Sequence, residues 1–114
     1  MEISATKSGQ VTSLELIGRL DANTSGPAQA KIAQFIDAGE MNLAFDLSRV
    51  EYISSAGLRV FMMAAKRVKA GGGKLVLHSA PPHIRELFDI AGLSEIFGLC
   101  ASREEALARF TPQS

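Results

Sequence analysis

The chain has 114 residues, of which 46% are hydrophobic and 21% charged, and its 12 basic and 12 acidic side chains give a formal net charge of +0 at pH 7. This length suits one domain with its own core, and the composition is that of an ordinary globular protein. The charge balance argues against electrostatic binding to nucleic acid or to an anionic membrane.

The first half of the chain predicts a hairpin, a helix and a central strand. Strands are expected at 3–6 and 11–20, joined by the glycine-containing turn KSGQ, and the second strand alternates leucines with charged residues. The segment DANTSGP supplies several helix-capping residues, and Gly39 marks the end of the helix that follows. Alternation in MNLAFDL then predicts a central strand over 41–47.

The second half predicts three helices separated by two strands. The helix after SSAG has an apolar stripe and ends at GGG; its predicted core positions are Leu58, Phe61, Met62, Ala65 and Val68. Next come a buried strand over 74–79, a helix over 81–92, a short strand over 95–100 and a helix over 102–110. The last four residues, TPQS, are expected to fray.

The predicted order is therefore β-β-α-β-α-β-α-β-α. Strands separated by helices indicate an α/β fold with a mostly parallel mixed sheet of about four to five strands, edged by the N-terminal hairpin. We expect a single domain over 1–114, with a core over about 3–110 and a frayed tail at 111–114.

The few cysteines and histidines limit the chemistry. Cys100 has no second cysteine to pair with, and with only His78 and His83 the spacing typical of a zinc site is absent. The first residues lack the pattern of a signal peptide, and no apolar run approaches the roughly 20 residues of a membrane helix. We expect a cytoplasmic, monomeric protein without metal or other cofactor and without contacts to membrane or nucleic acid.

Motifs of enzyme active sites are not matched either. Ile53 stands where a nucleophile elbow around Ser55 needs glycine, and Leu75 stands where a phosphate loop needs Ser or Thr after Lys74. The two histidines fit structural roles better than catalytic ones, and Cys100 fits a small buried hydrophobe. The sequence therefore predicts no catalytic activity.

Two adjacent hydroxyls, Ser54 and Ser55, stand where a helix is expected to begin. One reading is an N-cap, which stabilises a helix by about 1 kcal/mol. The other is a modification site, because free amides and the positive end of the helix dipole at this position favour a phosphate group. Ala56 and Gly57 are small, which would let another protein approach closely.

The sequence resembles the STAS-domain anti-sigma factor antagonists. The resemblance rests on LSRVEYISSAGLRV, preceded by GRLDANT and followed by GGKLVLHSAPPHIRELFDIAGL, and it covers roughly 3–110. It implies a partner-switching protein whose unphosphorylated form binds an anti-sigma factor, which is also a serine kinase with a histidine-kinase-like ATPase fold. Binding frees the sigma factor or another client, phosphorylation abolishes binding, and a PP2C-type phosphatase restores it.

The family's Asp-Ser-Ser/Thr-Gly pattern implies the site residues. The phosphate acceptor corresponds to Ser55, with Ser54 as the minor alternative, because Ser54 occupies the position where the family often has aspartate. The remaining residues expected to contact the partner are Asp21, Thr24, Asp46, Ser54, Ala56, Gly57, Arg59 and Met63. The polar residues Asp21, Thr24, Asp46 and Ser55 are expected to gather at one edge of the sheet.

Each of these expectations has an alternative in which the residue has only a structural role. Asp21 and Thr24 could be turn and cap residues, and Asp46 could simply hold loop amides. The alternative for the whole protein is a non-switching STAS scaffold or a subunit, for example of a lipid-transport complex, in which Ser55 only caps a helix.

Overall fold

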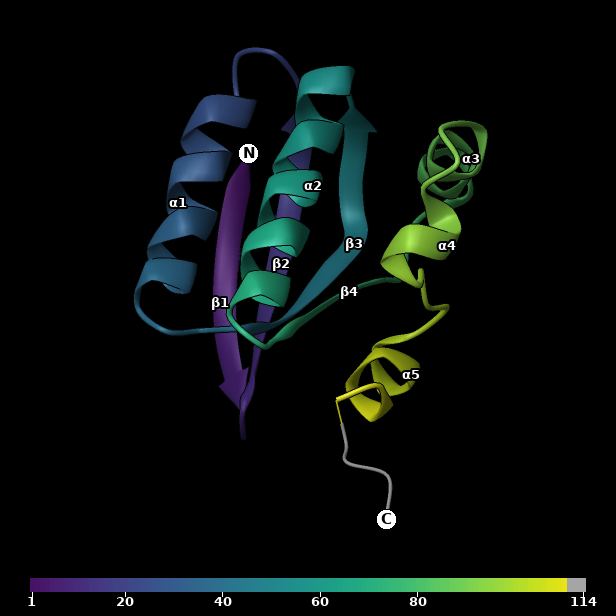
Figure 1. Ribbon diagram of the computed structural model, residues 1–114. Coiled ribbons are helices and arrows are strands. Elements are labelled where there is room, and N and C mark those ends of the chain that lie inside the picture. The colour runs from purple at the N-terminus through teal and green to yellow at the C-terminus, as the bar shows by residue number, and fades with distance from the viewer. Residues whose placement is uncertain (111–114) are drawn as a thin grey trace.

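The structure of the protein, a computed structural model, describes residues 1–110 (Figure 1). Its strands are β1 (Glu2–Ser8), β2 (Val11–Leu20), β3 (Asn42–Ile53) and β4 (Lys74–His78). Its helices are α1 (Ser25–Asp37), α2 (Ser55–Ala70), α3 (Pro82–Ile90), α4 (Ser94–Phe97) and α5 (Arg103–Ala108). No helix within residues 1–110 has the length and apolarity needed to cross a membrane. The predicted fraying of 111–114 lies outside the described residues.

The four strands form one mixed sheet in the order β1-β2-β3-β4. β1 and β2 make the predicted antiparallel hairpin, whereas β3 runs parallel to both β2 and β4. The register between β2 and β3 shifts between Gly18 and Arg19, and Gly18 has φ of 108°. On β3, the residues that pair with β4 are Asn42–Asp46, so β3 extends well beyond its shorter neighbour.

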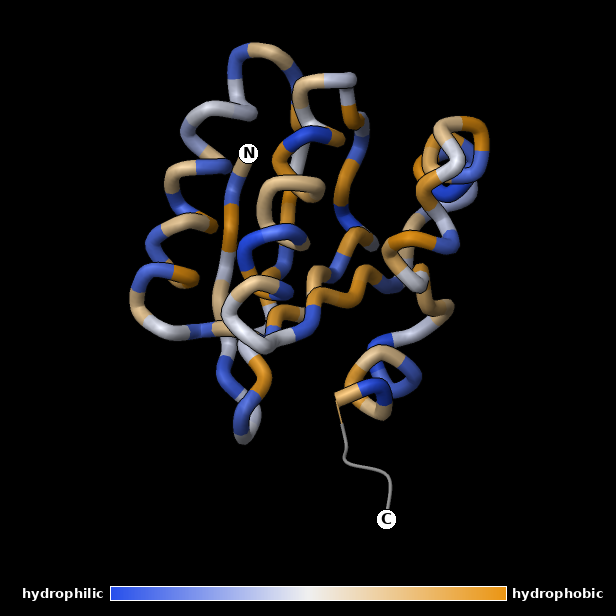
Figure 2. Tube along the Cα trace, viewed as in Figure 1, coloured by the Kyte–Doolittle hydropathy of each residue, from blue (hydrophilic) through white to orange (hydrophobic). Residues whose placement is uncertain are grey.

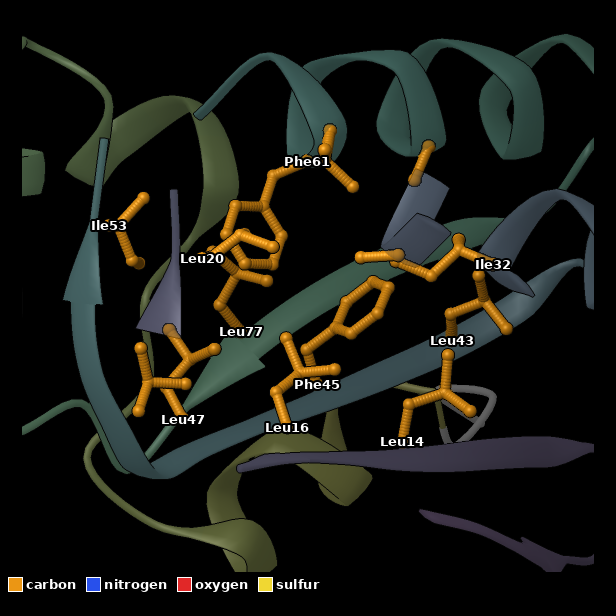
Figure 3. Close-up of a cluster of buried hydrophobic side chains, with 14 of the residues drawn as sticks. Leu14, Leu16, Leu20, Ile32, Leu43, Phe45, Leu47, Ile53, Phe61 and Leu77 are labelled. Atoms are coloured by element: carbon orange, nitrogen blue, oxygen red, sulfur yellow. The ribbon is translucent and has the colours of Figure 1, made fainter. Parts of the chain in front are cut away.

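One face of the sheet holds the main core. α1 and α2 lie side by side across this face (Figure 1), and side chains from alternate strand positions point toward them (Figure 3). Phe45 of β3 meets Phe61 of α2 edge to face, with ring centroids 5.6 Å apart, and Phe88 and Phe97 extend the aromatic cluster. These four rings are fully or almost fully buried, so this cluster ties α2, α3 and α4 to the sheet.

The opposite face is covered unevenly. α5 packs over β4, where Val76, Cys100 and Ala106 form a small second cluster. Hydropathy along the chain fits a sheet with one apolar and one polar face: hydrophobic and hydrophilic positions are mixed along β1, β2 and β3, β4 is mostly hydrophobic, and the β1–β2 turn is mostly hydrophilic (Figure 2). Next to the part that α5 covers, the sheet presents polar side chains from β1, β2 and β3.

Two expectations about this architecture are wrong. The segment expected to form a strand over 95–100 begins as the short helix α4, which Gly98 ends with φ of 58°, and only Cys100 makes an isolated bridge to His78. The segment is short and apolar, and such runs do not distinguish strand from helix. Met62, expected in the core, is 51% exposed, because Phe61 beside it takes the inward position.

Candidate functional site

The two adjacent serines occupy different places at the start of α2. Ser54 is the N-cap: its backbone is extended, and its Oγ accepts a hydrogen bond of 3.2 Å from the amide of Gly57. Ser55 is the first helical residue and is exposed, and its hydroxyl makes no hydrogen bond with any residue in 1–110. Ser54 is therefore the residue that caps α2, and the hydroxyl of Ser55 does not take part in capping.

Gly57 places this helix start close to the sheet. A Cβ at Gly57 would lie 2.7 Å from the carbonyl oxygen of Leu20 and 2.9 Å from Cγ2 of Ile53. Gly57 is also buried. The expectation that this glycine opens space for a partner is thus corrected: its missing side chain lets α2 approach the ends of β2 and β3.

The loop after β2 lies beside Ser55. The amide of Ser54 donates to the carbonyl oxygen of Leu20 at 2.8 Å, so the residue before Asp21 touches the residue before Ser55. Asp21 Oδ1 accepts from the amides of Asn23 at 2.9 Å and Thr24 at 3.1 Å. The hydroxyl of Thr24 accepts from the Asp21 amide and donates to the carbonyl oxygen of Arg19. The turn role considered for Asp21 and Thr24 is therefore present in the structure.

The carboxylate of Asp21 is a stable negative charge in this loop. The hydrogen bond from the Asn23 amide is the main reason that its pKa lies below the usual value, and Thr24 and Arg19 add to this, whereas partial burial opposes it. Arg19 Nε lies 3.8 Å from Oδ2, and its guanidinium also sits over the ring of Tyr52 at 4.6 Å. Asp21 is only half-buried, so its charge remains accessible at the edge of the sheet.

An exposed stripe on α2 leads away from Ser55. Arg59 and Met62 follow Ser55 by four and seven residues, which places the three on one side of a helix, and all are exposed. Met63 is instead half-buried and packs against the main core. The expectation that Met63 lies on the contact surface is therefore wrong, and Met62, which counting from Ser55 in helical steps selects, takes that place.

Asp46 does not belong to this surface. It stands opposite Glu15 of β2 and His78 of β4 in the sheet register and lines a hollow on the face opposite α1 and α2. It lies seven positions before Ile53 along β3, roughly 23 Å of extended chain. The expected gathering of Asp46 with Asp21, Thr24 and Ser55 is therefore wrong, although Asp46 Oδ1 does hold a nearby amide, that of Ser48, at 2.9 Å.

The remaining reactive side chains have structural surroundings. Cys100 is buried, and burial raises the pKa of its thiol. His83 lies in the first turn of α3, and its Nε2 is 2.9 Å from the carbonyl oxygen of Glu51. Within residues 1–110, no group of three or more His, Cys, Asp or Glu is placed to hold a metal ion.

Comparison with known proteins gives consistent relatives. The family model described as STAS domain matches residues 2–106. A Bordetella bronchiseptica protein named as an anti-sigma factor antagonist, BtrV, is 42% identical over 95 residues, which cover 83% of this chain and 82% of BtrV. The anti-sigma-B factor antagonist of Bacillus subtilis is 32% identical over 91 residues, covering 80% of this chain and 83% of that protein.

Solved structures show the same fold at lower sequence identity. The Bacillus anti-sigma factor antagonist SpoIIAA in its unphosphorylated form superposes with a TM-score of 0.80 at 22% identity, covering 95% of each chain. Its phosphorylated form gives a TM-score of 0.73, also at 22% identity, covering 96% of this chain and 100% of that one.

Proposed function

The chain belongs to the STAS-domain family of anti-sigma factor antagonists, and from this premise we propose that it switches partners through phosphorylation of Ser55. In this proposal the unphosphorylated protein binds an anti-sigma factor that is also a serine kinase with a histidine-kinase-like ATPase fold, and frees its sigma factor or another client. The kinase then transfers a phosphoryl group to Ser55 and the complex separates. A PP2C-type phosphatase hydrolyses the phosphoserine and restores binding.

The observation that carries this proposal is the division of roles between the two serines. The Oγ of Ser54 already accepts a hydrogen bond from the Gly57 amide, so a reaction at this oxygen would disturb an existing contact. Ser55 is exposed and has no hydrogen-bond partner among residues 1–110, so a kinase can reach its hydroxyl without breaking an internal contact. This favours Ser55 over Ser54 as the acceptor.

The fold tolerates the charge that phosphorylation adds. A phosphoserine carries about −1.5 to −2 charges at neutral pH, which suits the amide end of a helix. The first turn of α2 contains no acidic residue, and Arg59 stands four residues along the same side. Phosphorylation can therefore leave the structure intact while it changes the surface.

The same charge explains the loss of binding. The proposed contact surface consists of the loop residues Asp21 and Thr24, the helix start at Ser54–Ala56, and the stripe of Arg59 and Met62. At the helix start, Ser55 is the only exposed residue that carries a hydroxyl group. A dianion at Ser55 must be desolvated when a partner covers it, and it repels any acidic groups that the partner presents. The alternative of a non-switching scaffold gains no support from relatives named as antagonists.

The proposal is tested with each histidine-kinase-like protein that the same genome encodes. We expect incubation with one of these proteins and ATP to place one phosphate on Ser55, located by mass spectrometry of the tryptic peptides. In pull-downs, Ser55→Ala should bind and resist phosphorylation, and Ser55→Asp should lose binding. Ser54→Ala is the matched control and should still be phosphorylated at Ser55. Equal binding by Ser55→Asp and the unmodified protein would refute the switch.

A further inference from the structure

The exposed stripe that starts at Ser55 continues beyond Met62 to the last turn of α2. This helix lies in the layer that covers one face of the sheet, with α1 beside it (Figure 1). At about 100° per residue, five of its residues lie within about 40° of one line along the helix, and all five are exposed. These residues, here called the α2 stripe, are Ser55, Arg59, Met62, Lys66 and Lys69.

The charged side chains of α2 are all basic. The helix contains Arg59, Lys66, Arg67 and Lys69 but no aspartate or glutamate, although the formal net charge of the whole chain is +0. Arg67 lies off the stripe and pairs with Asp37 of α1. Within the part of the chain that the structure describes, the three cations on the stripe form neither an ion pair nor a side-chain hydrogen bond.

The stability of the helix does not account for these cations. Lys69 is in the last turn, where a cation suits the negative end of the helix dipole, but Arg59 and Lys66 come before that turn. Lys66 and Lys69 are three residues apart on the same side, and like charges at this spacing repel each other and weaken a helix. Acidic groups supplied by another molecule would turn this repulsion into attraction.

Met62 gives the stripe an apolar centre. Its side chain is 51% exposed and stands between the two cations Arg59 and Lys66 along the stripe. Methionine adapts its shape to irregular apolar surfaces, and protein interfaces commonly have an apolar centre within a polar rim. The stripe therefore has the composition of a docking surface.

From these observations we infer that the whole α2 stripe binds an acidic surface of the anti-sigma factor, with an apolar contact for Met62 at its middle. The inference rests on the proposed function and extends the proposed contact surface by Lys66 and Lys69. From Ser55 to Lys69 the stripe spans about 21 Å at the rise of an α-helix, so the acidic surface of the partner has at least that length.

An acidic partner surface also gives the phosphate its effect. A phosphate on Ser55 puts a dianion at one end of the stripe, opposite the carboxylates of the partner, and the repulsion opposes binding. Within the protein, the same phosphate stands four residues from Arg59 on one side of the helix, which is a favourable pairing. Binding is lost while the fold is retained.

The test measures binding without ATP to each histidine-kinase-like protein that the same genome encodes, by isothermal titration. The double variant Lys66→Gln/Lys69→Gln should bind about tenfold more weakly than the unmodified protein. Raising the NaCl concentration from about 50 mM to about 500 mM should weaken the unmodified complex more than that of the variant. The matched control Arg85→Gln/Arg103→Gln removes two exposed cations from α3 and α5 and should leave the affinity unchanged.

The outcomes separate the inference from the switch. Unchanged affinity and salt dependence in Lys66→Gln/Lys69→Gln, with binding still lost in Ser55→Asp, would overturn the acidic partner surface and leave the switch in place. Equal binding by Ser55→Asp and the unmodified protein would refute the switch, whereas a loss confined to the lysine variant would still support the stripe. No binding to any of these proteins would refute both.

Discussion

The two faces of the sheet differ in what their side chains achieve. On the face beneath α1 and α2, leucine, isoleucine and phenylalanine side chains are fully buried against helices, and almost every group has a packing partner. On the opposite face the same strands present hydroxyls, carboxylates and an imidazole, and two buried polar atoms have no partner among residues 1–110. The comparison indicates that the first face supplies most of the packing that stabilises the fold.

The largest expected effect contrasts neighbouring positions on opposite faces. Phe45→Ala removes a fully buried ring beneath α2 and should lower the free energy of unfolding by about 3–5 kcal/mol. Ser13→Ala removes a buried hydroxyl without a partner and should be neutral or slightly stabilising. Urea unfolding followed by circular dichroism measures both, and a large loss in Ser13→Ala would contradict the division between the faces.

A smaller effect is expected where α2 meets the ends of β2 and β3. Gly57→Ala should cost about 1–3 kcal/mol, because its methyl group would press on the backbone oxygen of Leu20. Gly26→Ala is the control in α1, where no atom lies within 4 Å of the added Cβ, and it should be neutral or stabilising. Thermal unfolding of the two variants compares them directly; similar losses would mean that close approach is not the role of Gly57.

The two serines should differ in stability as well as in modification. Ser54→Ala loses the hydrogen bond to the Gly57 amide and should lower stability by about 1 kcal/mol. Ser55→Ala touches no hydrogen bond and should stay within about 0.5 kcal/mol of the unmodified protein. Chemical denaturation gives both values, and a reversed order would assign the cap to Ser55.

The smallest expected effect is a pH dependence from the polar face. Burial lowers the pKa of His78 from 6.5, and Arg103 adds to this, while Asp46 opposes it. The unfolded chain therefore binds a proton at His78 more readily than the folded protein does. The stability that the protein has with His78 neutral is fully present above about pH 6.5, and the free energy of unfolding decreases as the pH falls below that value. His78→Gln should show a flatter stability profile between about pH 7.5 and 5.5 in denaturant titrations. An unchanged slope would mean that His78 is not held neutral.

The stretches that the sequence predicted well have strong, simple patterns. Alternation over 11–20 gave β2 with its observed ends, and the resemblance to the STAS family is confirmed by the family model and by the curated relatives. The sequence left open which of the two serines caps α2, because adjacent serines are equivalent in sequence and only the backbone geometry distinguishes them. The scaffold alternative gave the cap to Ser55, and this is wrong, because Ser54 is the N-cap.

The misplacement of Asp46 has a physical cause. The predicted strand stopped at Leu47, whereas β3 continues to Ile53, so Asp46 was assigned to an end that it does not occupy. Beyond Leu47 the buried positions are Val50 and Ile53, three residues apart, because the pairing of β3 with β2 contains register shifts. A spacing of three hides a strand from any search for alternation.

The unequal lengths of β3 and β4 have a consequence for self-association. Beyond Asp46, the side of β3 that faces β4 lacks a partner strand among residues 1–110, and unpaired strand backbone is a template on which another chain can add. His83 contacts the Glu51 carbonyl oxygen there, and α3 packs against β3. A single imidazole and one short helix thus cover an unpaired stretch of strand backbone, and detaching them would leave it open to pairing with another chain.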